Sequence, residues 1–106
     1  MSTTQVKKIV KQYASVLHKN KFAFSKIYLF GSYAKDKAQK DSDIDVAIIA
    51  NKTGSGKAYL NKKMKLWELT IDVDTRIEPI LIEEKDLKNG STIMGNEIKK
   101  YGIRVE

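Results

Sequence analysis

The chain has 106 residues, of which 42% are hydrophobic and 31% charged, with a formal net charge of +7 and no cysteine. This size and balance predict a single folded domain over residues 1–106, and they exclude a disordered chain, disulfide bonds and thiolate metal sites. No apolar run is long enough to span a membrane and the N-terminal residues lack the apolar core of a signal peptide, so we expect a cytoplasmic protein without membrane association.

Helical and strand-like patterns alternate in the first half of the chain. Apolar residues recur at helical spacing over residues 4–20, which predicts an amphipathic helix. Residues 26–30 form a short β run that ends at Gly31, and residues 32–38 are expected to form a short helix that begins at this turn. Residues 44–50 are almost continuously apolar, which is typical of a strand buried on both faces.

The second half continues with a loop rich in glycine and serine, residues 51–57, and a predicted helix over residues 57–69. That helix carries one apolar stripe, formed by Leu60, Met64 and Trp67. Residues 72–82 alternate as a long strand, in which Pro79 favours an edge position or a bulge.

The C-terminal part is less regular. The polar residues 83–88 are expected to form a turn, and residues 91–101 a last helix with Gly102 as its C-cap. Residues 103–105 either add a terminal strand or pack against the domain. No internal repeat or linker divides the chain.

Two acids stand at the start of the apolar run 44–50. In an extended chain the side chains of Asp43 and Asp45 point to the same face, where their carboxylates can hold a hard cation. The preceding β run ends in Gly31-Ser32, where free backbone N–H groups favour phosphate. A bare Asp-x-Asp is more often a solvated turn, but this one leads directly into a strand. The combination predicts a metal–nucleotide site.

A third carboxylate is expected from the later strand. Glu78 lies inside the β run 76–82, where a charge needs a partner or a metal ion. Asp74 is the alternative, because residues 74, 76 and 78 share one strand face. Without a metal role, Glu78 would pair with Arg76 or a lysine, and Asp74 would be a solvated residue at the strand end.

Gly31-Ser32, ten intervening residues and Asp43-x-Asp45 together resemble the defining motif of the DNA polymerase β-like nucleotidyltransferase superfamily. With its flanking residues the motif most resembles the minimal nucleotidyltransferase (MNT) proteins of prokaryotes. The resemblance implies an α/β fold, with a small mixed β-sheet and helices packed mainly on one face. The chain departs from the family at Lys35-Asp36, where Arg-Gly is frequent.

The resemblance also implies roles for the site residues. Asp43 and Asp45 would bind catalytic Mg²⁺ with a third acid, which we assign to Glu78, while Gly31 and Ser32 would hold the triphosphate. The implied reaction is two-metal transfer of a nucleoside monophosphate, most readily AMP from ATP, to an acceptor hydroxyl.

A chain this short is expected to find its acceptor on another macromolecule. Small proteins of this type are similar to antitoxins whose partners are helical HEPN-family toxins, modified with AMP on a tyrosine. The alternative is a non-catalytic module that senses a nucleotide or occludes a partner. Transfer of a nucleotide to a small molecule is a weaker hypothesis, because relatives with that activity are longer and carry an additional substrate-binding domain.

The charge is uneven, with +10 over residues 1–65 and −3 over residues 66–106. Lysine far outnumbers arginine and no aromatic residues are interleaved with the basic ones, so nucleic-acid binding receives only weak support. The base preference, the acceptor and the choice between a hetero- and a homo-oligomer are open at this level.

Overall fold

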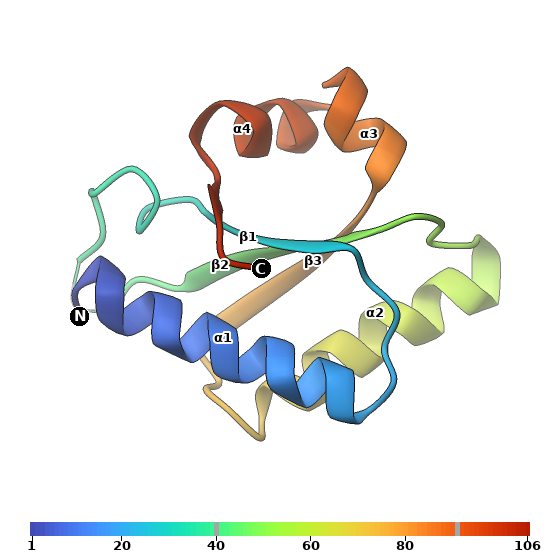
Figure 1. The fold of residues 1–106 in the computed structure, drawn as a ribbon, viewed down its shortest axis with the longest axis horizontal. Coiled ribbons are helices and arrows are strands. Elements are labelled where there is room, and N and C mark those ends of the chain that lie inside the picture. Colours follow the sequence, from blue (N-terminus) through green and yellow to red (C-terminus); the bar gives the residue numbers. More distant parts are fainter. Residues whose placement is uncertain (40, 91) are drawn as a thin grey trace.

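The computed structural model describes residues 1–39, 41–90 and 92–106. Within these ranges four strands form one mixed β-sheet in the order β3-β2-β1-β4 (Figure 1). The strands are β1 (Lys26–Phe30), β2 (Ile44–Ala50), β3 (Ile77–Glu83) and β4 (Ile103–Arg104). Strand β2 is parallel to β3 and antiparallel to β1, and β4 is antiparallel to β1. The mixed α/β fold expected from the sequence is confirmed.

The part of the chain that the structure describes contains the helices α1 (Thr3–Lys19), α2 (Gly56–Thr70), α3 (Glu84–Asn89) and α4 (Ile93–Tyr101). The two long helices, α1 and α2, pack on one face of the sheet, and the two short ones, α3 and α4, lie on the other (Figure 1). Most of the helical mass is thus on one face, as expected, and the second face has a thinner cover. No helix in the described residues is long and apolar enough to cross a membrane.

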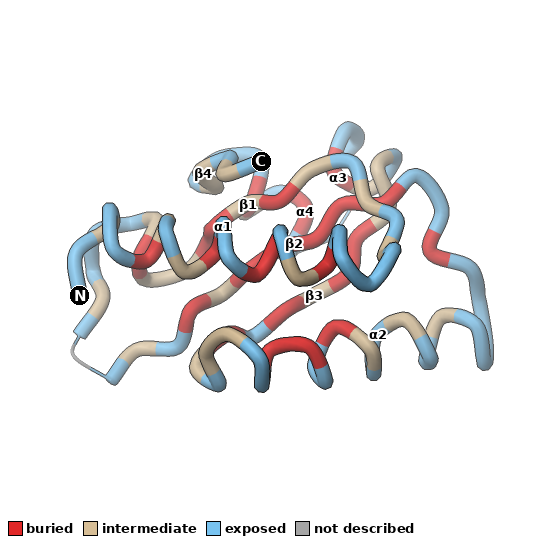
Figure 2. Tube along the Cα trace, turned by 60° about the horizontal axis from the view of Figure 1, so that its bottom comes forward, coloured by how far each residue is buried: buried red, intermediate tan, exposed pale blue. Residues whose placement is uncertain are grey.

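The period-two alternation of β2 divides the core into two layers. Ile44, Val46 and Ile48 point towards α1 and α2, whereas Ala47 and Ile49 point towards α3 and α4. Every residue of β2 except Asp45 is buried, and Figure 2 shows buried positions along the central strands. The nearly continuous apolar run is therefore a central strand covered on both faces.

Helix α1 begins at a capping box in which Ser2 and Gln5 satisfy each other's backbone N–H groups. Its buried stripe reaches α2, where the Tyr13 hydroxyl donates a hydrogen bond to the carbonyl oxygen of Leu66 at 2.7 Å. Burial raises the pKa of Tyr13, so this hydroxyl stays protonated and the two long helices are joined by a buried polar contact.

The expectation of a short helix over residues 32–38 is wrong. Only turns are present: the N–H of Lys35 bonds to the carbonyl of Gly31, and that of Lys37 to the carbonyl of Ser32. Asp36 takes a left-handed conformation with φ of 57° and ends the single helical turn, in the manner of a Schellman motif.

Two later boundaries also differ from the sequence predictions. The strand expected over residues 72–82 begins only at Ile77, because residues 71–74 continue from α2 in turns that bond back to its last carbonyls. The expected turn 83–88 is instead helix α3, favoured by acidic residues in its first turn and ended by Gly90 in the left-handed conformation.

The last helix begins at Ile93, with Thr92 as its N-cap, whereas Ser91 of the predicted range lies outside the described residues. Gly102 is its C-cap, as predicted, although with extended rather than left-handed backbone. Pro79 lies in β3, which is an edge strand, so the expected edge position is confirmed.

Candidate active site

Two strands and the residue just before one of them bring three acidic residues to one end of the sheet. Because β1 and β2 are antiparallel, Phe30 at the end of β1 pairs with Asp45 at the start of β2. The parallel register of β2 and β3 places Glu78 directly beside Asp45. Asp43, two residues before Asp45, adds the third carboxylate. The cluster of Asp43, Asp45 and Glu78 is called the acid cluster below.

The acid cluster belongs to the face of the sheet that α3 and α4 cover. Asp45 alternates with Ala47 and Ile49, and Glu78 with Ile80 and Ile82, all of which contribute to the core layer beneath those helices. Asp45 is half-buried, while Asp43 and Glu78 are exposed. Glu78 is exposed because β3 is an edge strand and opens to solvent here, so burial does not force its charge to find a partner.

Gly31 lies against the Asp45 carboxylate. Its φ is +73°, and a Cβ atom at this position would lie 2.1 Å from Asp45 Oδ2. Glycine is therefore required both by the backbone conformation and by the close approach of the side chain. The ten-residue spacing between Gly31-Ser32 and Asp43-x-Asp45 closes into a direct contact in the fold.

The pKa of Asp45 is raised to about 6, first by burial and then by the charges of Glu78 and Asp43 and a hydrogen bond with the Glu78 carboxyl. In the described part of the chain no lysine or arginine forms an ion pair with any member of the acid cluster. The negative charge is left without an internal counterion, which is the electrostatic condition for binding a cation.

The donor set fits a hard divalent cation, because it offers only carboxylate oxygens. Within residues 1–39, 41–90 and 92–106, no three acidic, histidine or cysteine side chains form a ready-made metal centre. The fit therefore rests on the register that places Asp45 beside Glu78 and on the absence of an ion-pair partner for either acid among the described residues, rather than on a preformed cage.

Asp74, the alternative third acid, has another partner. Its carboxylate accepts hydrogen bonds from Arg76 Nε at 3.0 Å, from Arg76 Nη2 at 2.6 Å and from the Arg76 backbone N–H at 2.9 Å. These bonds lower the pKa of Asp74. Arg76 is thus engaged with Asp74 and not with Glu78, and the structure brings only Glu78 next to Asp45.

The turn after Gly31 offers backbone donors to the same end of the sheet. None of the hydrogen bonds among the described residues uses the N–H groups of Ser32 or Tyr33. The expected helix N-terminus is absent, so a phosphate here would meet turn amides instead of a helix dipole.

Helix α4 brings a further charged residue, Glu97, that the sequence argument missed. Lys35 Nζ lies 2.6 Å from Glu97 Oε1 and 4.9 Å from the centre of the Tyr101 ring. The hydrogen bond to Glu97 raises the pKa of Lys35, and the Glu97 charge in turn adds to the rise in the pKa of Asp45. The i, i+4 spacing of Glu97 and Tyr101 was the available signal that both occupy one helix face.

The chain is similar to known proteins over most of its length. Residues 6–100 match the family described as "Polymerase beta, Nucleotidyltransferase". The chain is 29% identical to the Methanocaldococcus jannaschii protein named "Putative protein adenylyltransferase MJ0141", over 99% of this chain and 100% of that relative.

Two solved structures are also similar. A toxin–antitoxin crystal structure with AMP-PNP is 26% identical with a TM-score of 0.57, over 94% of this chain and 72% of that chain. A complex of a tri-AMPylated Shewanella oneidensis HEPN toxin with an MNT antitoxin is similar in fold, at 23% identity and a TM-score of 0.54, over 98% of this chain and 71% of that chain.

Proposed function

The chain belongs to the polymerase beta nucleotidyltransferase family, and from this premise we propose that it transfers AMP from ATP to a hydroxyl group on a partner protein, with Mg²⁺ as cofactor. The observation that carries the proposal is the Asp45 carboxylate, which lies against Gly31 and beside Glu78 and has no ion-pair partner among the described residues. Supporting it, one relative is named an adenylyltransferase, and one similar structure contains AMP-PNP.

We assign Asp43, Asp45 and Glu78 as the metal ligands. When bound, Mg²⁺ neutralises triphosphate charge and lowers the pKa of the acceptor hydroxyl. Gly31 lets the Asp45 carboxylate approach the turn, and the N–H groups of Ser32 and Tyr33 are available to the phosphates. In the reaction the acceptor oxygen bonds to the α-phosphorus, the bond to the bridging oxygen breaks, and pyrophosphate leaves with the electron pair. The hydroxyl proton passes to solvent.

The acceptor is proposed to lie on a separate protein of the HEPN type. Asp43 and Glu78 are exposed, so a segment of another molecule can reach the site without a rearrangement of the core. The similar structures include toxin–antitoxin complexes, one of them with an AMPylated HEPN toxin. The cytoplasmic location expected from the sequence stays a prediction.

The decisive experiment incubates the protein with Mg²⁺, each nucleoside triphosphate in turn and the protein that co-purifies with it. Intact mass spectrometry then looks for one nucleotide added to that partner, and a coupled assay follows pyrophosphate release. ATP is expected to give both signals, and Asp43→Asn with Asp45→Asn should give neither.

A different outcome separates the alternatives. If ATP binds in a Mg²⁺-dependent manner but neither adduct nor pyrophosphate appears, the transfer reaction is wrong and the non-catalytic, nucleotide-sensing module is right. If the wild type and the double variant inhibit the activity of the partner protein equally, occlusion of the partner alone explains the inhibition.

A further inference from the structure

Helix α2 presents a row of large apolar side chains to solvent. Leu60, Met64, Trp67 and Ile71, the residue after the helix, have exposed fractions of 54%, 61%, 46% and 72%. Their spacing of four, three and four residues places them on one stripe, called the α2 stripe below. The sequence pattern correctly predicted a helix here, but the side that packs into the domain is the opposite one, with Leu66 and Leu69.

The α2 stripe lies on the far side of the molecule from the acid cluster. Helix α2 shares its face of the sheet with α1, whereas the acid cluster lies on the face of α3 and α4 (Figure 1). In Figure 2 helix α2 forms the outer edge of the molecule, with exposed positions along its outward side. An interaction through the stripe therefore leaves the acid cluster open.

We infer that two copies of this chain associate through their α2 stripes as an antiparallel helix pair. A spacing of four, three and four reads the same in both directions. A twofold axis between Met64 and Trp67 therefore puts Leu60 opposite Ile71 of the other copy, and Met64 opposite its Trp67. The surface is self-complementary, as a closed twofold interface requires.

The charges that line the groove along the stripe are mixed in sign. The charged residues that line the groove along it are one lysine, Lys63, and one glutamate, Glu68. The rim therefore carries both signs and does not select a partner of one charge. Large apolar surface of this kind on a small domain marks an interaction site.

The expected dimer is weak. At their exposed fractions the four side chains and their flanking stems bury on the order of 1,000 Å² in a pair, near the lower limit for specific interfaces. The net charge of +7 on each copy opposes association, and salt screens that repulsion. Association is thus expected to strengthen as salt is raised, whereas binding of an acidic partner protein would weaken.

Sedimentation equilibrium over a range of concentrations and salt tests the inference. The mass of the wild type should rise from 12.0 kDa towards twice that value, at lower protein concentration when salt is higher. Met64→Gln with Trp67→Gln should weaken association by at least about tenfold. The matched control is Ile93→Ser, which removes a 90% exposed apolar side chain from α4 and should change nothing.

A chain that stays monomeric at every concentration and salt overturns the inference and leaves the stripe to another protein. The same holds if Ile93→Ser weakens association as much as the α2 variant. Circular dichroism melts of each variant show that the domain remains folded, which is expected because all three side chains are on the outside.

Disulfide cross-linking tests the orientation, since the chain has no cysteine of its own. A chain with both Leu60→Cys and Ile71→Cys should form intermolecular disulfides, because the antiparallel pair brings these positions together. Each single variant should stay uncross-linked, because like positions are about 16 Å apart along the paired helices. Single variants that cross-link as readily as the double variant would overturn the antiparallel pair.

Discussion

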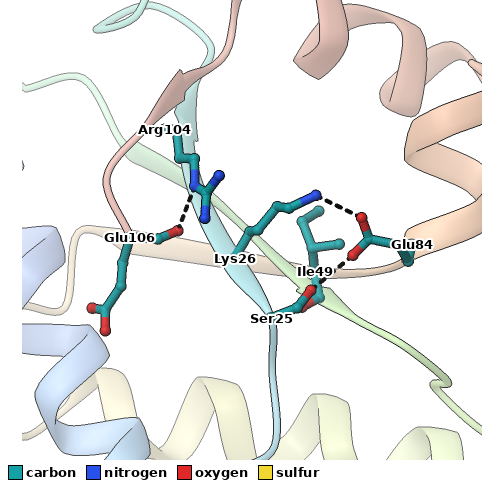
Figure 3. Close-up of polar contacts among 6 residues, drawn as sticks. All are labelled: Ser25, Lys26, Ile49, Glu84, Arg104 and Glu106. Carbon is teal, nitrogen blue, oxygen red and sulfur yellow. Dashed lines mark hydrogen bonds and ion pairs between the residues drawn. The ribbon is translucent and has the colours of Figure 1, made fainter.

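Strand β1 has an acidic side chain near each of its ends, and the surroundings of the two acids are opposite. At its start Glu84 accepts from Lys26 Nζ at 2.6 Å and from the Ser25 hydroxyl at 2.8 Å, and Ser25 also bonds the Ile49 carbonyl (Figure 3). These contacts, the Lys26 hydrogen bond first, lower the pKa of Glu84. At its other end Asp45 meets Glu78 and Asp43, and its pKa is raised to about 6.

This contrast separates an acidic side chain that stabilises the fold from acidic side chains that have no such role and are proposed to bind a ligand. An acid with an internal counterion contributes to folding, as Glu84 does beside Lys26. An acid pressed against other acids opposes folding until a cation arrives. The same strand therefore joins a structural end to the proposed binding end, and the predictions below test this contrast.

The largest effect is expected from Gly31→Ala at the binding end. The new Cβ would lie 2.1 Å from Asp45 Oδ2, and φ of +73° adds strain. Mg²⁺-dependent ATP binding should fall by at least about a hundredfold, because more than 2.7 kcal/mol is lost when the carboxylate is displaced. Isothermal titration calorimetry measures this loss.

Gly54→Ala is the matched control. It has a φ of +77°, but the nearest atom to its Cβ would be 3.5 Å away. Backbone strain alone should lower the free energy of unfolding of this variant by about 1 kcal/mol, as measured in urea, and ATP binding should be unchanged. Equal loss of binding in both variants would mean that strain alone matters and that the Asp45 contact does not.

The second prediction separates the two candidate third acids. Glu78→Gln removes a carboxylate beside Asp45 and should weaken Mg²⁺-dependent ATP binding by about tenfold or more. Asp74→Asn breaks the contact with Arg76, so it should lower thermal stability slightly and leave binding unchanged. Loss of binding only in Asp74→Asn would reverse the assignment.

The third prediction concerns the pH dependence of stability without metal, in the presence of a chelator. The folded pKa of Asp45 lies above its ordinary 3.8, so the folded state holds this proton more tightly. The resulting stabilisation is present at low pH and is lost as pH rises through about 6. The free energy of unfolding of Asp45→Asn should therefore exceed that of the wild type at pH 8, by about 1 kcal/mol for a half-exposed group. At pH 4 the two should be equally stable.

Glu84 at the structural end should behave in the reverse way. Its folded pKa is lowered, so its contribution is present above its ordinary pKa and is lost as pH falls through the folded value. Glu84→Gln should accordingly be less stable than wild type at pH 7, with the difference shrinking in acid. Urea unfolding of Asp45→Asn and Glu84→Gln across pH measures both differences from the wild type. If the two differences changed with pH in the same direction, the contrast between the two ends would be wrong.

The sequence predicted the binding end as far as local spacing allows. The two-residue alternation of side chains in a strand places Asp43 and Asp45 on one face. The glycine of the turn is visible in the sequence, but its contact with Asp45 is not. The position of Glu78 beside Asp45 depends on the parallel register of β2 and β3, which no local pattern encodes. Lys35 and Glu97 meet only because α4 folds back over the second face of the sheet.

Two features of the fold could not be predicted from the hydrophobic pattern. Helix α2 is apolar on both sides, so the pattern predicted a helix but not which side of it is buried. The expected helix 32–38 ended after one turn because Asp36 adopts a left-handed conformation, and a single residue's backbone choice is not visible in hydrophobic periodicity. Both were decided by tertiary packing and turn geometry rather than by propensity.

The smallest effect is expected at Asp36, where the chain departs from the Arg-Gly that is frequent in the family. Asp36 holds a φ of 57°, a conformation that costs an aspartate some strain and glycine none. Asp36→Gly should stabilise the domain by roughly 0.5 kcal/mol, since the relief of strain slightly exceeds the added entropy of the unfolded chain. Urea unfolding measures the gain. Because the turn keeps its path, ATP binding should be unchanged; a destabilised Asp36→Gly would mean that the aspartate side chain itself holds the turn after Gly31.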